Sequence, residues 1–200
     1  PNDMWQADFK GHFQMQNGER CYPLNILDDC SRFCLCSDAL RNETLGEVKP
    51  VFQRLFKEYG LPFSLLCDNG NPWGTSQSMG YTAFEVWLME LGVLTIHGRP
   101  LHPQTQGKDE RYNRSFTREC LNVNSFLDIA DAQLKFDAYR SFYNNIRPHC
   151  ALDLNVPSAV FQKSEHPFPE KVIDWEYGPE YQPCKVSETG YFSYGGHRYF

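Results

Sequence analysis

The alternation of apolar and polar residues in the first forty positions predicts three β-strands. Residues 4–10 form one short alternating segment, and residues 21–28 and 32–39 form two more. Asn17-Gly18 is a typical hairpin turn, and a tight polar turn joins the second and third strands. Pro23 has no backbone N–H, which indicates an edge strand or a strand end at that position. We expect these strands to form a meander.

Further along the chain, apolar residues recur at the helical period of about 3.6 residues. The stripe from Val48 to Tyr59 predicts a helix over residues 44–59, ended by Gly60. Pro50 either kinks this helix or marks its true start. The pattern then predicts strands over residues 64–67 and 93–97, and helices over residues 82–91, 108–123 and 128–146. Strand–helix–strand crossovers need parallel pairing, so we expect an α/β fold with a mixed five-stranded sheet flanked by helices.

A change in composition predicts the domain organisation. Residues 1–163 hold the predicted sheet and helices, and residues 164–183 begin with a Pro- and Glu-rich stretch typical of a linker. Residues 184–200 alternate again between Gly turns, which indicates the start of a small β module that is truncated here. Because the first residue is Pro rather than Met, we interpret the sequence as a fragment or a processed product.

Composition limits the classes of protein that fit. With 41% apolar and 22% charged residues among 200, the chain is globular and can bury a substantial core. No apolar run is long enough for a transmembrane helix, and no signal peptide is evident. Eight cysteines without zinc-type spacing predict buried free thiols in a reducing compartment. The net charge of −6 excludes DNA binding through a uniform positive field, so any nucleic-acid function needs a local basic patch or another domain.

Three carboxylates are predicted to meet at one edge of the sheet. Asp8 lies in the first strand, on the face opposite Trp5 and Ala7, Asp68 follows the strand 64–67, and Glu110 opens a helix. If those two strands are neighbours, the carboxylates converge where open α/β sheets bind ligands. Converging carboxylates repel each other unless a divalent cation neutralises them, and oxygen ligands favour Mg²⁺ or Mn²⁺. Taken singly, Asp68 also fits a turn and Glu110 a helix N-terminus.

The helix that carries Glu110 also offers a candidate DNA-binding surface. At about 100° per residue, Arg114 and Arg118 fall within a quarter turn of Glu110 and could hold phosphates. Gln106 lies on the other side of Glu110, and Lys108 and Arg111 lie further round. The alternative is that the two arginines are solvated and paired with Glu110 and Glu119. The opposite helix face is predicted to enter the core through Tyr112, Phe116, Cys120 and Val123.

Other polar and aromatic residues allow two interpretations each. His97 and His102 flank the loop before Glu110, and each either positions substrate or that loop, or is an ordinary hydrogen-bonded histidine. Asp28 and Asp29 come before a turn, and for Asp28 we favour turn formation over a place near the metals. Trp73 and Tyr81 could stack on DNA bases, but packing is the better prediction for both.

Four motifs occur in one order along the chain. They are Trp5-Gln6-Ala7-Asp8-Phe9, Leu27-Asp28-Asp29-Cys30-Ser31-Arg32, Asp68-Asn69-Gly70 and the string from Pro103 to Glu110. Over residues 3–161 the sequence resembles the DDE catalytic core shared by bacterial insertion-sequence transposases and retroviral integrases. The resemblance is closer to the bacterial transposases, through His97-Gly98-Arg99-Pro100, Tyr143-Asn144-Asn145 and Arg147-Pro148-His149.

This resemblance implies a ribonuclease H-like fold and a polynucleotidyl transferase. Asp8, Asp68 and Glu110 would bind two divalent ions, Mg²⁺ or Mn²⁺, with Asn69 and Gln104 as accessory residues. The enzyme would nick transposon ends to free a 3′-hydroxyl and join it to target DNA, as a homo-oligomer on DNA in the bacterial cytoplasm and without a nucleotide cofactor. The spacing of 42 residues between Asp68 and Glu110 is slightly long for the family, which affects only the subgroup.

Two other hypotheses stay open at this stage. The chain could be a ribonuclease H-like nuclease without joining activity, or a non-catalytic interaction domain. The acidic composition is the main observation in favour of the second.

Overall fold

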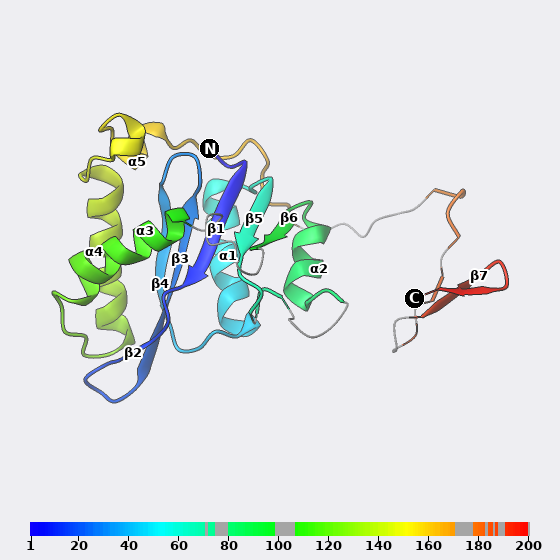
Figure 1. Cartoon of the computed structure of the whole chain (residues 1–200), viewed down its shortest axis with the longest axis horizontal. Helices are drawn as coiled ribbons and strands as arrows, with labels where there is room; N and C mark the ends of the chain where they lie inside the picture. The colour runs from blue at the N-terminus through cyan, green and yellow to red at the C-terminus, as the bar shows by residue number, and fades with distance from the viewer. Residues whose placement is uncertain are drawn as a thin grey trace.

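A mixed β-sheet forms the centre of the computed structural model, which describes residues 1–70, 72–74, 80–98, 107–170, 178–182, 184–185, 187 and 191–199. Its strands are β1 (Met4–Phe9), β2 (Phe13–Gln14), β3 (Arg20–Asp28), β4 (Cys34–Leu40), β5 (Ser64–Cys67) and β6 (Leu94–His97). The five longer strands lie in the order β4-β3-β1-β5-β6, and the short β2 pairs with the start of β3. β3 runs antiparallel to β1 and β4, whereas β5 and β6 continue the sheet in parallel. The predicted mixed sheet is confirmed (Figure 1).

Helices cover both faces of this sheet (Figure 1). They are α1 (Leu45–Tyr59), α2 (Ala83–Glu90), α3 (Gly107–Phe116) with a π-helical continuation over Thr117–Leu121, α4 (Ile129–Asn145), a 3₁₀ turn (Cys150–Leu152) and α5 (Pro157–Val160). Pro50 lies inside α1, so it does not mark the start of the helix. Gly60 ends α1 with a φ of 81°, a conformation that glycine adopts without strain. Thr82 caps α2 and Asp128 caps α4 through side-chain acceptors.

Two apolar clusters form the core. One contains Trp5 and Ala7 of β1 together with the buried faces of α1 and α2. The other contains Cys21 and Leu27 of β3 with the buried residues of α3 and α4. The alternation of β1 therefore sends its apolar residues toward α1 and leaves its polar residues on the face covered by α3.

Burial corrects or confirms four packing predictions. Val123 is 67% exposed rather than in the core, because the helix turns π-helical at Thr117 and ends at Leu121, which shifts the phase of the stripe. Tyr81 is 69% exposed, so its predicted packing is wrong, whereas Trp73 is buried as predicted. Five cysteines are buried, but Cys30 and Cys150 are exposed and Cys184 is half-buried.

The chain after α5 begins by packing on the sheet domain. The backbone N–H of Ser164 donates to the Tyr59 carbonyl at 2.8 Å, and that of Leu61 donates to the His166 carbonyl at 2.7 Å. Near the C-terminus, β7 (Phe192–Tyr194) and β8 (His197–Tyr199) form a small antiparallel hairpin. The boundaries at 163 and 183 stay predictions. Within the described residues, no helix is long and apolar enough to cross a membrane.

Candidate active site

Asp8 and Asp68 lie side by side at the ends of two neighbouring parallel strands. Paired residues of β1 and β5 differ by 60 in number, from Met4 with Ser64 to Gln6 with Leu66, and Asp8 and Asp68 continue this register. Burial of Asp8 and the negative charge of Asp68 raise the pKa of the Asp8 carboxyl to about 6. The expectation that the two strands are neighbours is confirmed, and the carboxylates are close enough to repel each other.

The Asp68 side chain belongs to a tight turn. The backbone N–H of Gly70 donates to Asp68 Oδ1 at 2.9 Å, and Asn69 Nδ2 donates to the Gly98 carbonyl at 3.0 Å. A Cβ at Gly70 would lie 3.3 Å from Asp68 Oδ1, so glycine permits this close approach. The turn interpretation of this motif is therefore right, and it leaves the Asp68 residue exposed at the edge of the sheet.

His97 connects this turn to helix α2. Its Nδ1 lies 2.8 Å from the Asp68 carbonyl oxygen, and its Nε2 lies 2.8 Å from Glu85 Oε1. Burial raises the pKa of Glu85, but the hydrogen bonds from Thr82 and His97 outweigh it and lower the pKa overall. A Cβ at Gly74 would lie only 2.9 Å from His97 Cε1, so the imidazole is also packed from that side. His97 thus holds the turn that carries Asp68.

Glu110 shares an open depression with Asp8. This catalytic depression, as we call it, has a volume of about 550 Å³ and is lined by Asp8, Glu110, Arg114, Arg118, Lys10, Phe9, Asn113 and Thr117. The structure brings Arg114 and Arg118 to this wall and gives neither an ion pair within the described residues. Glu119 pairs with Arg147 at 3.1 Å instead, so the alternative pairing of Glu119 with the two arginines is wrong.

The three carboxylates do not form one cluster. Among the described residues, no group of three His, Cys, Asp or Glu side chains is close enough to hold a metal ion. The pair Asp8 and Asp68 does fit a divalent cation, because its donors are hard oxygens and its mutual repulsion would be relieved by positive charge. Glu110 is exposed on α3 and lies outside this pair.

The remaining predicted residues fall into three groups. Lys108 contacts the Asp29 carboxylate and, with Arg111, lines a different cavity on the other side of α3. Asp28 is fully buried and accepts from the N–H and Oγ of Ser31 at 2.7 and 2.6 Å, which confirms its turn-forming role. Three predicted residues, His102, Gln104 and Gln106, lie outside the described residues.

A row of polar residues that was not predicted from the sequence supports Asp8. The sheet register places Asp8 opposite Asn25 and Asn25 opposite Ser37. Asn113 Nδ2 donates to Asp8 Oδ2 at 2.6 Å, and Asn25 Nδ2 donates to Asn113 Oδ1 at 2.7 Å. Ser37 Oγ in turn donates to Asn25 Oδ1 at 2.7 Å. The signal in the sequence was an asparagine within the apolar strand β3 and another one turn after Glu110.

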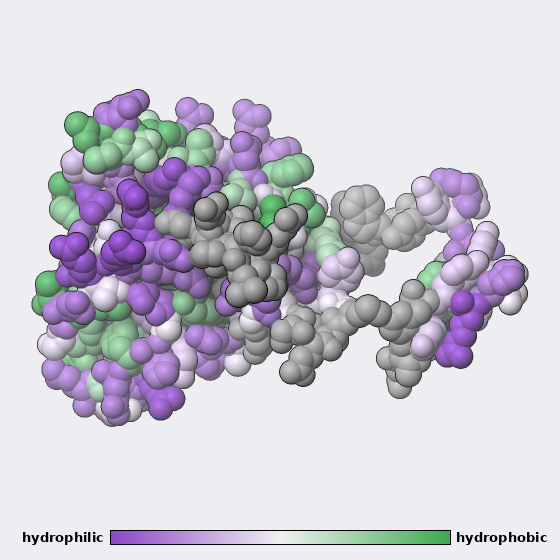
Figure 2. Space-filling view, viewed as in Figure 1, coloured by the Kyte–Doolittle hydropathy of each residue, from purple (hydrophilic) through white to green (hydrophobic). Residues whose placement is uncertain are grey.

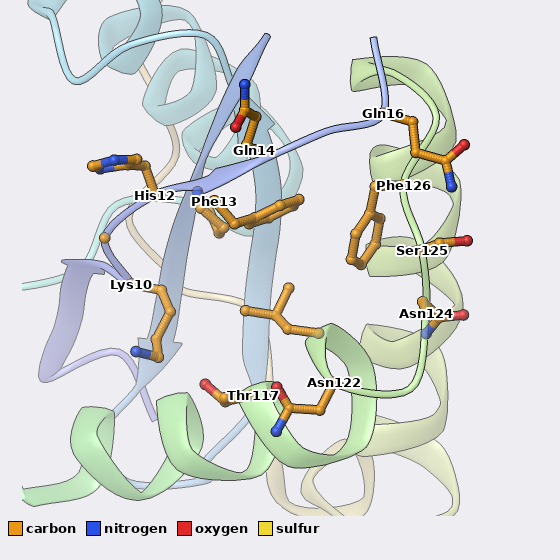
Figure 3. A pocket seen from close by; sticks show the side chains of 13 residues that line it. Lys10, His12, Phe13, Gln14, Gln16, Thr117, Asn122, Asn124, Ser125 and Phe126 are labelled. Atoms are coloured by element: carbon orange, nitrogen blue, oxygen red, sulfur yellow. The ribbon is translucent and has the colours of Figure 1, made fainter. Parts of the chain in front are cut away.

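The catalytic depression continues into a second one along the π-helical turn. The two share Lys10 and Thr117. Figure 3 shows these two side chains at one end, with Phe13 and Phe126 deeper inside and the amides of Gln16, Asn122 and Asn124 around the rim. The second depression has a volume of about 410 Å³. Figure 2 shows hydrophilic residues gathered over α3.

Comparison with protein families and curated proteins gives consistent matches. Two family models, each described as an integrase core domain, match residues 1–103 and 91–157. The chain is 30% identical over 161 residues to an uncharacterized 39.2 kDa protein of insertion element IS476 from Xanthomonas euvesicatoria, covering 80% of this chain and 44% of that protein. It is 29% identical over 165 residues to an uncharacterized 31.7 kDa protein of insertion element IS407 from Burkholderia multivorans, covering 82% of this chain and 56% of that protein. It therefore spans about half the length of these relatives.

Solved structures of retroviral integrases share the fold. The intasome of simian T-cell lymphotropic virus matches with a TM-score of 0.63 at 18% identity, covering 89% of this chain and 60% of that chain. The HTLV-2 integrase catalytic core in complex with magnesium matches with a TM-score of 0.57 at 16% identity, covering 80% of this chain and 96% of that chain. The fold is thus the ribonuclease H-like fold of integrase cores. The match of the integrase core domain family model over residues 1–103, just over half of the chain, shows that the chain belongs to this family.

Proposed function

We propose that this chain is the catalytic core of a transposase that nicks DNA and joins the freed end to a target. The observation that carries the proposal is the pair Asp8 and Asp68 at the ends of neighbouring parallel strands, in an integrase core fold. The matches to insertion-element proteins and to an intasome support DNA as substrate and a homo-oligomer as the working form. Two DNA ends joined in one event need at least two copies of the chain.

Asp8, Asp68 and Glu110 are the proposed metal ligands. Asp8 and Asp68 would hold a divalent cation between them, and Glu110, which lines the same catalytic depression as Asp8, would be the third ligand. The HTLV-2 core, which has the same fold, is in complex with magnesium. When bound, two divalent ions lower the pKa of an attacking hydroxyl or water and stabilise the charge on the leaving oxygen.

The residues around the pair have distinct proposed tasks. Arg114 and Arg118 hold the phosphates of the DNA strand, since charge-assisted hydrogen bonds to phosphate are strong and directional. Asn113 fixes the direction of the Asp8 carboxylate, and His97 and Asn69 hold the turn that carries Asp68. With these groups in place, the scissile phosphodiester is positioned in line with its nucleophile.

The proposed reaction has two balanced displacements at phosphorus. In the first, water oxygen bonds to phosphorus while the bond from phosphorus to the 3′-oxygen breaks, which leaves a 3′-hydroxyl and a 5′-phosphate. In the second, that 3′-hydroxyl bonds to a target phosphorus, its proton leaves, and the target 3′-oxygen departs and is protonated. No covalent bond to the protein is needed at either step.

A strand-transfer assay on labelled duplexes with the terminal sequences of the element tests the proposal. We expect Asp8→Asn, Asp68→Asn and Glu110→Gln each to lower nicking and joining by about a thousandfold or more, since each removes a metal ligand. Glu43→Gln, at a half-buried acidic residue distant in the chain from all three, is the matched control and should keep wild-type activity.

A second measurement, thermal unfolding, tests the metal site independently of enzymatic activity. Mn²⁺ should raise the melting temperature of the wild type, and this increase should disappear in Asp8→Asn, because only the native state has the site. Nicking without joining would identify a nuclease instead of a transposase. No Mn²⁺ response together with wild-type activity in the triad variants would refute the proposed ligands, and no activity in any form would favour an interaction domain.

A further inference from the structure

The side of α3 that faces away from the catalytic depression lines a separate cavity, which we call the basic cavity. It has a volume of about 490 Å³. Lys108, Arg111 and Ser115 reach it from α3, at the spacing of three and four residues that places side chains on one helix face. The other walls come from the turn between β3 and β4, from the last turn of α4 and from the chain after it. The residues important here are Arg32, Tyr143, Arg147 and His149. The Arg147-Pro148-His149 motif has no task in the proposed reaction.

The basic cavity has an excess of positive charge. Four cationic side chains line it, and no carboxylate is among its lining residues. Arg147 is held by Glu119, with contacts of 3.1 and 3.2 Å, and Lys108 contacts Asp29, so two of the four charges are balanced at the rim. Arg32 and Arg111 have no ion pair within the described part of the chain. About two positive charges are therefore left for an anion.

Two buried nitrogen atoms of this cavity also lack partners. Arg32 Nη1 and His149 Nε2 are shielded from solvent and make no hydrogen bond to any described residue. A buried guanidinium N–H without an acceptor is unfavourable, because it has lost its water without replacement. Arg32 also has a φ of 63°, a backbone region in which Gly, Asn or Asp would be less strained. An arginine at this position is explained if its side chain has a ligand.

We propose that the basic cavity binds a phosphate group, with Arg32 and Arg111 donating hydrogen bonds to its oxygens. A tetrahedral phosphate suits two guanidinium groups, which present paired N–H donors. The source we favour is the backbone of bound DNA, because α3 carries both this cavity and Glu110 and so presents two phosphate-binding sides to one duplex. This choice of source rests on the proposed function, whereas free inorganic phosphate is the second source and does not depend on it.

The first arm of the test uses inorganic phosphate in EDTA, so that no metal is present. Thermal unfolding is followed with increasing sodium phosphate, with NaCl used to keep the ionic strength constant. Phosphate should raise the melting temperature of the wild type, and Arg32→Gln and Arg111→Gln should abolish this response. Arg111 is exposed, so its variant does not risk the fold. The control is Arg41→Gln, since Arg41 pairs with Glu19 on the surface at 3.3 Å and should respond as the wild type does.

The second arm measures binding of a fluorescent duplex by anisotropy, again in EDTA. Each cavity variant should bind about tenfold more weakly and lower the salt dependence of the binding constant by about one unit of slope, whereas Arg41→Gln should stay within about twofold. A phosphate response with unchanged DNA binding would assign the cavity to free phosphate. No phosphate response and unchanged DNA binding would overturn the proposal. Neither arm needs catalysis or metal. Failure of the phosphate proposal is therefore distinguishable from failure of the proposed metal ligands.

Discussion

The two faces of the central sheet are filled by different chemistry. The face under α1 and α2 is packed with aromatic rings, among which Phe52 contacts Phe56, Phe84 and Trp73 with ring centroids 5.1 to 5.9 Å apart. The face under α3 and α4 has its own apolar cluster, but the row from Asp8 through Asn25 to Ser37 runs across it. Here α3 contributes the buried rings of Tyr112 and Phe116 and, beside them, a buried amide, Asn113, that reaches Asp8.

The two kinds of packing have different effects: apolar burial stabilises the fold, whereas the hydrogen-bonded row orients a side chain. Apolar burial is non-directional, so the aromatic face stabilises the sheet without fixing any side chain to a ligand. A buried hydrogen-bonded row is stabilising only when every member has a partner, but it fixes the orientation of the group at its end. That group is Asp8. The polar row therefore holds a carboxylate in place, on a sheet that has a buried apolar cluster on each face.

The largest effect on stability is expected on the aromatic face. Phe52 is fully buried, so Phe52→Ala should lower the free energy of unfolding by about 3–5 kcal/mol through lost burial and the remaining cavity. Urea unfolding measures this change. Phe63→Ala is the matched control, because Phe63 is 67% exposed and its truncation should change stability by less than about 0.5 kcal/mol. Equal effects from the two substitutions would contradict the division between the faces.

A smaller loss is expected from the polar row, and it should also reach the metal site. Asn113→Leu keeps the branched shape of the side chain but leaves Asp8 Oδ2 and Asn25 Nδ2 without their partner, which should lower stability by about 2–3 kcal/mol. Mn²⁺ affinity, measured on folded protein, should fall as well because Asp8 is no longer held. Asn145→Leu is the control, since among the described residues the Asn145 amide bonds only the Ser141 carbonyl on the surface. Unchanged Mn²⁺ affinity in Asn113→Leu would show that the row is only structural.

Much of this fold could be predicted from local pattern. The stripe that predicted α1 is buried as expected, and the strands around Asp8 and Asp68 pair in parallel as their crossover required. Local pattern failed where geometry depends on neighbours. The π-helical turn after Phe116 has no marker in the sequence, and it displaced Val123 from the core.

The candidate site was predictable only in part, for the same reason. Asp8 and Asp68 follow from strand order, because parallel neighbours end at the same edge. Asn113 does not, since its task is visible only when β3 and α3 are brought together and its partners Asp8 and Asn25 are known. The unpaired Arg32 and His149 nitrogens are likewise a property of packing, because a sequence shows cations but not which of them lose their water.

The smallest effect is a gain of stability at the polar face. The pKa of Asp8 is about 6 in the folded chain because of burial and the charge of Asp68, whereas an unfolded aspartate has a pKa near 3.8. Between these values the folded state binds a proton that the unfolded state has lost, so the free energy of unfolding decreases as pH rises through this window. Asp8→Asn removes the titrating group. Without metal, the variant should be more stable than the wild type at pH 7, by up to about 2 kcal/mol, with little difference near pH 4.

Metal should reverse this order. Saturating Mn²⁺ stabilises only a protein that keeps both aspartates, so the wild type should become the more stable form at pH 7. Unfolding curves in EDTA and in Mn²⁺ at both pH values measure the four differences. A wild type that is more stable than Asp8→Asn at pH 7 in EDTA would mean that the two carboxylates do not repel each other. The aspartate pair would then stabilise the fold, as the aromatic face does. The distinction between a stabilising face and a face that orients Asp8 would therefore be wrong at Asp8 itself.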